Sequence, residues 1–367
     1  MINMASSQPP LENSEFSIVS VQELIKDPNI TVPNSYFRPD QEPPKPLNGN
    51  HYFPAIPTID LERLVSEEQA EFELAKLEST CKEWGIFQLV NHGVSSSLLE
   101  KLKFEIQEFF NLPLEEKMKY KIKPDDFEGY GSVVRSDGKL DWGDKLYMTT
   151  NPIHMRESHL FPELPSSLRN TLEYYFQEMQ NLSRKLLGMI GKTLNTEIKE
   201  MEELFEDGMQ SVRFNYYPPC SKPELVMGLA PHSDATVITI LNQLNGVDGL
   251  HIKKDSVWIP VSILPEALAI NLGDILEIMS NGLYQSVEHR ASINSAKERM
   301  SIAFFVCPKF DAEIGAARSL IIPENPPLFK RIGTEEYFKS FFSRKLKGKT
   351  NLEYMKIENG EGMHHNI

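Results

Sequence analysis

Ser211-Val-Arg-Phe-Asn-Tyr-Tyr-Pro-Pro-Cys220 is the stretch of the 367-residue chain that decides the fold. Arg213, Asn215 and Tyr217 alternate with apolar or aromatic residues, which is the period of a half-buried β-strand. Pro218-Pro219 ends the strand because proline has no N–H to donate to a sheet. The sequence therefore predicts a strand with one polar and one apolar face, although an ordinary sheet strand with a solvated face would leave the same pattern.

Short strands separated by turn signals continue downstream of this stretch. The turn signals are Asn245-Gly246, Asp248-Gly249, Lys254-Asp255 and Asn281-Gly282. Many short strands with regular turns favour a sandwich or a barrel. Upstream, apolar residues recur at helical spacing over residues 99–109 and 168–186, so two amphipathic helices are expected to pack against the sheet.

A possible metal site lies inside this β-rich region. His232 and Asp234 are two residues apart, so on an extended backbone their side chains leave the same face and can meet one ion. A third ligand is predicted from a hairpin, in which residues 273–280 form one strand, Asn281-Gly282 forms a type I′ turn, and the returning strand brings His289.

Two imidazoles and one carboxylate on one side of a metal form the ligand set of non-haem Fe(II) oxygenases, which leaves coordination positions open for oxygen chemistry. A lone His-x-Asp arises by chance in many chains of this length, and a single histidine on an apolar strand is more often a packed core residue. The downstream histidine favours the metal site.

Arg299 and Ser301 strengthen this interpretation. They are two residues apart and so share a strand face, where a guanidinium beside a hydroxyl suits a carboxylate. A surface salt bridge would also explain Arg299. The neighbouring residues 302–306 are too apolar for a solvated strand, so a buried anionic partner is expected.

Five ordered motifs now stand along the chain: Trp84-Gly-Ile-Phe-Gln-Leu-Val-Asn-His-Gly93, Asn215-Tyr-Tyr-Pro218, His232-Ser-Asp234, Val287-Glu-His-Arg290 and Arg299-Met-Ser301. By these motifs and their spacing, about residues 18–357 resemble the plant 2-oxoglutarate- and Fe(II)-dependent dioxygenases. Further stretches resemble the senescence-related subgroup that includes alkaloid O-demethylases of poppy: Phe109-Phe-Asn-Leu-Pro113, Glu128-Gly-Tyr-Gly131, Leu140-Asp-Trp142 and Ser343-Arg-Lys-Leu346.

The resemblance implies a mainly β fold with flanking helices and a double-stranded β-helix core, that is, a cupin-like jelly roll. It implies that Fe(II) is held by His232, Asp234 and His289. It implies 2-oxoglutarate as co-substrate, with its distal carboxylate on Arg299 and Ser301, assisted by Tyr217 and Asn215. Ascorbate is expected as reductant. The implied reaction consumes O2, releases succinate and CO2, and hydroxylates or O-demethylates a small specialised metabolite such as an alkaloid or a phenolic.

Four residues are expected to line an aromatic, largely apolar substrate pocket, although each would also serve as core filler: Phe305, Tyr130, Tyr147 and Leu241. Flavonoid-oxidising relatives often carry an acidic residue where this chain has Cys307. That departure counts against a flavonoid substrate.

Three functional alternatives stay open. The same residues would support desaturation or ring closure. The same fold and iron would also support an oxidase that uses another reductant and no 2-oxoglutarate, as ethylene-forming oxidases do. A binding protein on an inert jelly roll is disfavoured, because a binding module needs neither the metal ligands nor the arginine–serine pair.

Composition limits the partners. A formal net charge of −14 argues against nucleic acid, which requires a basic surface. Three cysteines, Cys81, Cys220 and Cys307, show no disulfide framework and suit a reducing compartment. No apolar run is long enough to span a bilayer, and neither a secretion signal nor a lipidation signal is found. A cytoplasmic monomer that acts on a small molecule is expected.

The chain is expected to divide into an N-terminal arm (1–50), a helical and mixed region (51–205), the jelly-roll core with the Fe(II) and 2-oxoglutarate site (206–310) and a C-terminal segment (311–367). A short helix is expected near residues 21–26 of the arm. Another, around residues 334–345, could cover the open end of the core as a lid.

Overall fold

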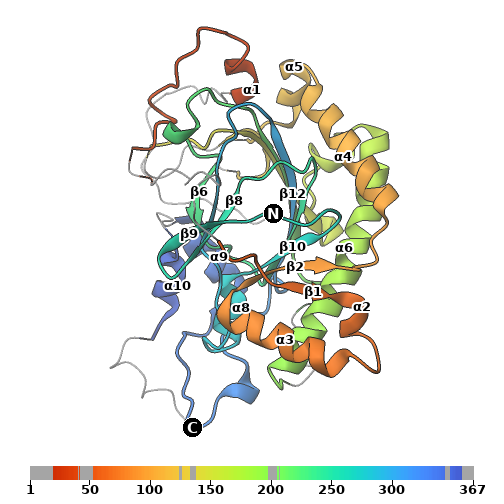
Figure 1. Ribbon diagram of the computed structural model, residues 1–367, viewed down its shortest axis with the longest axis vertical. Helices are drawn as coiled ribbons and strands as arrows, with labels where there is room; N and C mark the ends of the chain where they lie inside the picture. Colours follow the sequence, from red (N-terminus) through yellow and green to blue (C-terminus); the bar gives the residue numbers. More distant parts are fainter. Residues whose placement is uncertain are drawn as a thin grey trace.

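The computed structural model describes residues 20–39, 41, 53–123, 126–132, 138–196, 205, 207–343 and 348–357. Most of the predicted arm and three residues of the Ser343-Arg-Lys-Leu346 motif lie outside these ranges. Two sheets face each other and helices cover the outer face of the larger one (Figure 1).

The larger sheet, called the major sheet below, has eight strands in the described part of the chain, in the order β1 (Thr58–Asp60), β2 (Ile86–Val90), β10 (Leu268–Leu272), β7 (Ile238–Gln243), β12 (Arg299–Val306), β5 (Gln210–Tyr217), β4 (Asp144–Asn151) and β3 (Gly129–Tyr130). Neighbours are antiparallel except β1 and β2, which are parallel. The sheet combines strands from the predicted 51–205 and 206–310 regions.

The smaller sheet, called the minor sheet, has the order β6 (Leu229–His232), β11 (His289–Ala291), β8 (Leu250–Lys254) and β9 (Val257–Pro260). A two-stranded sheet pairs β13 (Glu313–Ile314) with β14 (Ile332–Gly333). Antiparallel sheets packed face to face, with the order along each sheet differing from the order along the chain, make up the predicted jelly-roll core.

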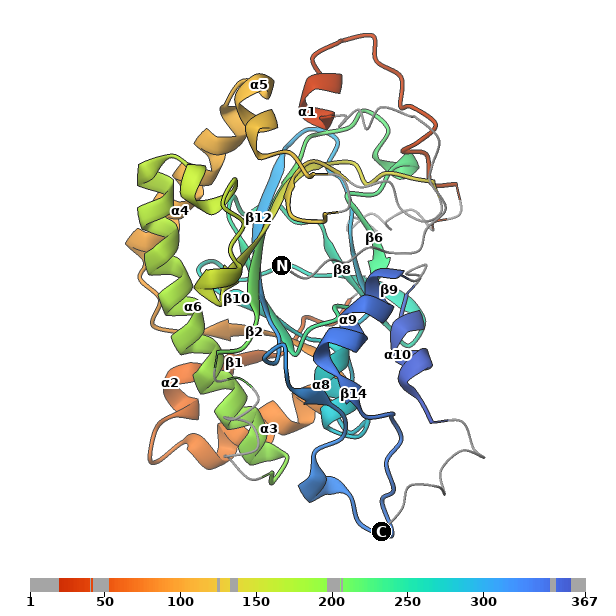
Figure 2. The same ribbon diagram turned by 180° about the vertical axis from the view of Figure 1, so that it is seen from behind.

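The helices are α1 (Val21–Leu24), α2 (Leu61–Leu64), α3 (Ala70–Glu83), α4 (Ser96–Asn111), α5 (Leu114–Lys117), α6 (Ser166–Thr193), α8 (Asp274–Met279), α9 (Thr334–Ser343) and α10 (Thr350–Met355). Figure 2 shows α4 and α6 along the outer face of the major sheet and α9 and α10 on the side of the minor sheet. The helices predicted at residues 99–109 and 168–186 are confirmed as parts of α4 and α6, and the short helix near residues 21–26 is confirmed as α1.

Strand alternation decides which side chains of β12 face the cavity between the sheets. Met300, Ile302 and Phe304 belong to the core cluster under the helices, and the Phe304 ring lies 6.3 Å from that of Phe176 on α6. The intervening residues line the cavity: Arg299, Ser301, Ala303 and Phe305. The same period on β5 turns Arg213, Asn215 and Tyr217 inward. The sequence predicted that the three share one face, and it predicted the cavity for Asn215 and Tyr217 only.

The strand predicted at residues 273–280 is wrong, because residues 274–279 form helix α8. The returning strand of the predicted hairpin begins only at His289, as β11 (His289–Ala291). All six residues of α8 are buried, and its two acids, Asp274 and Glu277, are too few in so short a run to separate a helical period from a strand period by pattern alone. Asn281 and Gly282 do have positive φ values, 52° and 80°, as a type I′ turn requires. They end the helix, where the Gly282 N–H donates to the Glu277 carbonyl.

Candidate metal centre

Two strands of the minor sheet bring the histidines together. His232 and His289 are register partners on β6 and β11, and their ring centroids are 4.3 Å apart. Strand β6 ends at His232, so Asp234 lies beyond the strand, whereas the sequence analysis had placed both on one extended segment. Asp234 Oδ1 is nevertheless 3.4 Å from His232 Nε2 and 3.7 Å from His289 Nε2.

Backbone carbonyls orient both imidazoles. Nδ1 of His232 lies 2.9 Å from the Ala230 carbonyl oxygen, and Nδ1 of His289 lies 3.1 Å from that of Val287. A carbonyl can only accept, so each Nδ1 carries a proton, and in a neutral imidazole so oriented Nε2 has the lone pair that a metal requires. Donor atoms of the two histidines and Asp234 all lie within 4.8 Å of one another.

The carboxylate of Asp234 is also held in one orientation. Its Oδ2 accepts a hydrogen bond of 2.7 Å from the Thr239 hydroxyl, which leaves Oδ1 facing the histidines. Burial raises the pKa of Asp234, but the electrostatic interaction with His289 and the contacts with His232 and Thr239 outweigh it and hold the pKa below its usual range. Burial lowers the pKa of His289 to about 4. At neutral pH the cluster thus offers an anionic carboxylate and a neutral imidazole of His289.

Two strands of the major sheet form the other end of the cavity. Arg299 and Ser301 on β12 stand opposite Tyr217 and Asn215 on β5, and Asn215 Nδ2 donates to Ser301 Oγ over 3.3 Å. The Arg299 guanidinium lies 5.5 Å from the centre of the Tyr217 ring and is 3% exposed. Among the described residues, no carboxylate lies within ion-pair distance of it.

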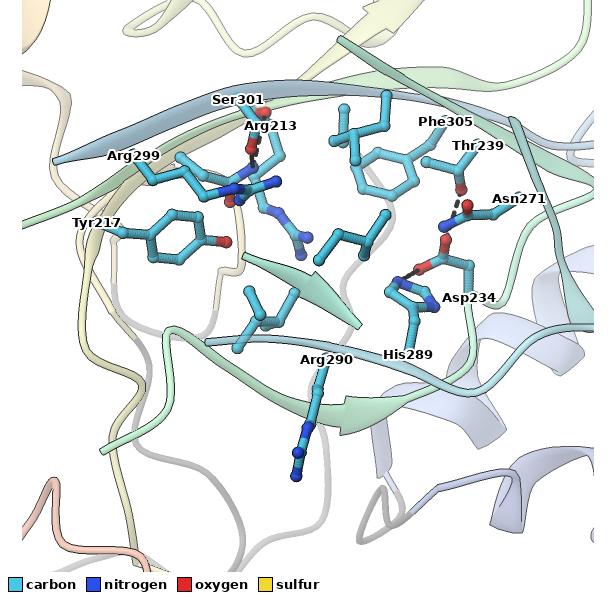
Figure 3. A pocket seen from close by; sticks show the side chains of 16 residues that line it. Arg213, Tyr217, Asp234, Thr239, Asn271, His289, Arg290, Arg299, Ser301 and Phe305 are labelled. Carbon is cyan, nitrogen blue, oxygen red and sulfur yellow. Dashed lines mark hydrogen bonds and ion pairs between the residues drawn. The ribbon is translucent and has the colours of Figure 1, made fainter. Parts of the chain in front are cut away.

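The two ends open into one cavity. It is lined by Arg213, Asn215, Tyr217, Leu229, Asp234, Thr239, Leu241, Leu250, Asn271, His289, Arg290, Ala291, Arg299, Ser301, Ala303 and Phe305. Figure 3 shows Arg299 and Tyr217 at one end and His289 and Asp234 at the other, while the Arg290 side chain points away.

The residues predicted to line the substrate pocket divide into three cases. Phe305 and Leu241 line the cavity. Tyr147 lies behind this wall, with its ring 6.2 Å from that of Phe305 and its hydroxyl bonded to Ser211. Tyr130 does not belong to the lining, and its placement there is corrected.

Tyr130 is part of the core cluster beneath the helices. Its hydroxyl donates to the buried Asp144 carboxylate over 2.7 Å, and its ring packs against Phe109. The ring of Tyr130 therefore serves core packing, and its hydroxyl serves a buried hydrogen bond.

Several lining residues were not predicted from the sequence, and the polar ones among them include Thr239, Asn271 and Arg213. Thr239 and Asn271 come from neighbouring strands, β7 and β10, that the motifs do not include. No sequence spacing relates them to the predicted site residues. Arg213 was left open between a solvated face and the cavity. It lines the cavity with its guanidinium 5.4 Å from the Phe305 ring centre, and among the described residues no carboxylate pairs with it.

The residues fit a metal ion and a carboxylate ligand. His232 Nε2 is buried without a hydrogen-bond partner, as is Arg299 Nε. A buried nitrogen lone pair suits a metal, and a buried guanidinium without a carboxylate suits an anionic ligand.

Comparison with known proteins decides the family. The profile of the 2OG-Fe(II) oxygenase superfamily matches residues 208–308, and a profile described as the N-terminal part of a non-haem dioxygenase in morphine synthesis matches residues 56–166. Protein SRG1 of Arabidopsis thaliana is 47% identical over 94% of this chain and 98% of its own length. The chain belongs to the 2OG-Fe(II) oxygenase superfamily. It is an oxidoreductase of a family that uses Fe(II) and 2-oxoglutarate.

Other members are equally similar. Codeine O-demethylase of Papaver somniferum is 50% identical over 93% of this chain and 96% of its own length. Oxoglutarate-dependent flavonoid 7-O-demethylase 1 of Ocimum basilicum is 48% identical over 93% and 92%. These relatives confirm the senescence-related and demethylase subgroup.

Among solved structures, JOX2 in complex with 2OG, Fe and JA superimposes with a TM-score of 0.84, at 35% identity, over 93% of this chain and 98% of that chain. This similarity confirms the jelly-roll fold class. Of the helices within the described ranges, none is long and apolar enough to cross a membrane.

Proposed function

We propose that this oxygenase hydroxylates or O-demethylates a small specialised metabolite at the cavity between its two sheets, releasing succinate and CO2. The observation that carries the proposal is that Asp234 and His289 of the metal cluster line the same cavity as the buried Arg299, with which no carboxylate of the described residues pairs. When bound, Fe(II) supplies the oxidation that couples decarboxylation of 2-oxoglutarate to attack on a substrate C–H bond.

In this proposal, each end of the cavity has a separate task. His232, Asp234 and His289 hold the metal through Nε2, Oδ1 and Nε2 and leave other coordination positions to ligands. Arg299 and Ser301 bind the distal carboxylate of 2-oxoglutarate. The distal carboxylate exchanges water for a guanidinium that is already desolvated, so binding also fixes the orientation of the co-substrate.

Tyr217 and Asn215 act as supports for that pair. The Tyr217 ring lies against the guanidinium, and the Asn215 amide donates to the Ser301 hydroxyl, so the hydroxyl proton is left free to donate to a carboxylate. The surrounding buried strands exclude bulk water from both ends.

The substrate would occupy the wall formed by Phe305 and Leu241. An aromatic and aliphatic wall suits a flat or polycyclic molecule. Arg213 adds a positive charge beside Phe305, which suits the oxygen of a phenolic better than a protonated amine. Relatives named as demethylases of a flavonoid and of codeine support O-demethylation of either class, so methoxylated phenolics are the first compounds to test and alkaloids the second.

Ascorbate as reductant, a monomeric state and a cytosolic location complete the proposal. The three cysteines are buried and free, which suits a reducing compartment.

The test is turnover of purified protein with a panel of methoxylated phenolics and alkaloids. Succinate formation that needs Fe(II), O2 and 2-oxoglutarate together, accompanied by formaldehyde, is expected for O-demethylation, and a hydroxylated product without formaldehyde for hydroxylation. Full activity without 2-oxoglutarate would overturn the proposal in favour of an oxidase that uses another reductant. A desaturated or cyclised product would overturn the proposed reaction type.

A further inference from the structure

The strands that carry the metal ligands are anchored from outside the sheet by helix α8. Asp274, the first residue of α8, is fully buried and accepts from two hydroxyls: Ser233 Oγ over 3.0 Å and Ser286 Oγ over 2.6 Å. The Asp274 N–H also donates to the Asp234 carbonyl over 2.8 Å. Ser233 lies between His232 and Asp234, and Ser286 lies three residues before His289, so this one carboxylate joins both ligand-bearing segments.

A second acid of α8 holds the same segment. Glu277 Oε2 accepts the Ser286 N–H over 2.6 Å. Asp274 and Glu277 are three residues apart on one helix, so two buried carboxyl groups lie close together. Such an arrangement is unstable unless a cation or further donors compensate it.

The compensating cation comes from the far end of the chain. Lys349, between α9 and α10, places its Nζ 2.6 Å from Glu277 Oε2 and 3.1 Å from the Ser286 carbonyl oxygen. The preceding Gly348 forms an isolated parallel bridge with His232. The same two residues therefore reach both histidine-bearing segments, and Figures 1 and 2 show α10 beside the minor sheet.

We propose that Lys349 is a positioning residue of the metal centre, acting through Glu277 and Ser286 on the segment that carries His289. This inference rests on the proposed function of the His232–Asp234–His289 cluster. It makes docking of the C-terminal segment a condition for tight metal binding, although Lys349 touches no ligand atom. Residues that orient metal ligands from outside typically change metal affinity about 10- to 100-fold when removed.

The experiment is Co²⁺ titration of the full chain, followed by the visible absorption of the bound ion, with anaerobic Fe²⁺ equilibrium dialysis as a second readout. Lys349→Met, which keeps the length of the side chain, is expected to raise the dissociation constant for Co²⁺ about tenfold. Lys349→Arg should restore binding to within about threefold of wild type, because it keeps the charge and can reach both acceptors.

Lys339→Met is the matched control. Lys339 lies on α9 and pairs with exposed Glu335 at 2.6 Å. Loss of that surface pair should leave the dissociation constant unchanged. An unchanged constant in Lys349→Met would overturn the inference even if the melting temperature fell, because a purely structural role would lower only stability.

A double-mutant cycle keeps the inference testable if Lys349→Met folds poorly. Glu277→Gln combined with Lys349→Met removes both partners of the ion pair, so Glu277 is not left as a buried acid without its lysine, and Asp274 keeps its two hydroxyl donors. The double variant should bind Co²⁺ no more weakly than whichever single variant binds it less tightly. If the losses of binding free energy in the two single variants add up in the double variant, the inference is overturned. Failure of wild type to bind Co²⁺ would overturn the proposed function itself. Normal binding by wild type together with equal binding by Lys349→Met would overturn only the inference about Lys349.

Discussion

The two sheets hold their halves of the site in different ways. In the major sheet, Arg299 and Ser301 are the first and third residues of the eight-residue strand β12, which β5 pairs along its whole length and β7 pairs from Ser301 onward. In the minor sheet, β11 is three residues long, its register with β6 shifts after His289, and Asp234 lies beyond the end of β6.

This difference shows where a site needs outside support. An eight-residue ladder with β5, which begins at Arg299 itself, fixes the direction of every second side chain of β12. The short strands of the minor sheet lack such a ladder around their ligands. These ligands are held by the Ala230 and Val287 carbonyls, by the Thr239 hydroxyl and by the acids of α8.

The largest expected effect comes from removing a ligand of the minor sheet. Asp234→Ala should abolish metal binding and turnover, because the two imidazoles alone give neither the charge nor the geometry of the site. Co²⁺ titration and succinate release measure the two losses, and far-ultraviolet circular dichroism checks that the metal-free fold is kept. Turnover near that of wild type would mean that Asp234 is no ligand.

Arg299→Ala should damage the major-sheet half alone. If the co-substrate carboxylate is buried against Arg299, the loss is about 2 to 5 kcal/mol. This corresponds to roughly a 30- to 5,000-fold rise in the KM for 2-oxoglutarate. Steady-state kinetics with varied 2-oxoglutarate give the KM, and Co²⁺ affinity should stay within about twofold of wild type. A KM equal to that of wild type would show that Arg299 serves another purpose.

Acid should weaken the minor sheet selectively. Burial lowers the pKa of His251 on β8 to about 4, below the unfolded value of about 6.5. The unfolded chain therefore binds the proton first, so the stability contribution is present above pH 6.5 and is lost as the pH falls to about 4.

His251→Asn should remove this acid sensitivity, while Arg299 in the major sheet stays charged throughout. An asparagine amide can still donate to the Gly249 carbonyl, which lies 3.2 Å from His251 Nδ1. Urea unfolding of the metal-free proteins at pH 7.5 and 4.5 should show wild type losing up to about 3 kcal/mol more than the variant. Equal losses in the two proteins would contradict the buried neutral state of His251.

The smallest expected effect tests one outside support of the metal ligands. Ser233→Ala removes one hydrogen bond to Asp274 and should weaken Co²⁺ binding by about 1 kcal/mol, roughly fivefold. Ser211→Ala is the matched control on the major sheet, where the hydroxyl accepts from Tyr147 away from the metal ligands. If both variants bind Co²⁺ equally well, α8 is not an anchor of the ligands.

Sequence reasoning worked where one physical rule acts alone. Alternation along β5 and β12 places Arg213, Asn215, Tyr217, Arg299 and Ser301 on the cavity face. It failed at residues 273–280, because a helix of six buried residues with only two acids is too short for pattern alone to separate helix from strand. Tyr130 was misplaced because an aromatic residue near a motif can serve either packing or a pocket.

The contacts that support the ligands could not be predicted at all. Lys349 meets Glu277 across 72 positions of sequence, and Asp274 meets Ser233 across 41. Such pairs form because distant chain segments meet in the folded structure. The local periodicity of the sequence does not predict these meetings.

The most direct test of the two-ended cavity is anaerobic addition of Fe(II) and 2-oxoglutarate to the purified protein, followed by visible spectroscopy. A weak charge-transfer band that needs both additions, disappears in Asp234→Ala and requires much more 2-oxoglutarate in Arg299→Ala is the predicted result. Iron that binds tightly while 2-oxoglutarate produces no band would contradict the assignment of the cavity to this co-substrate.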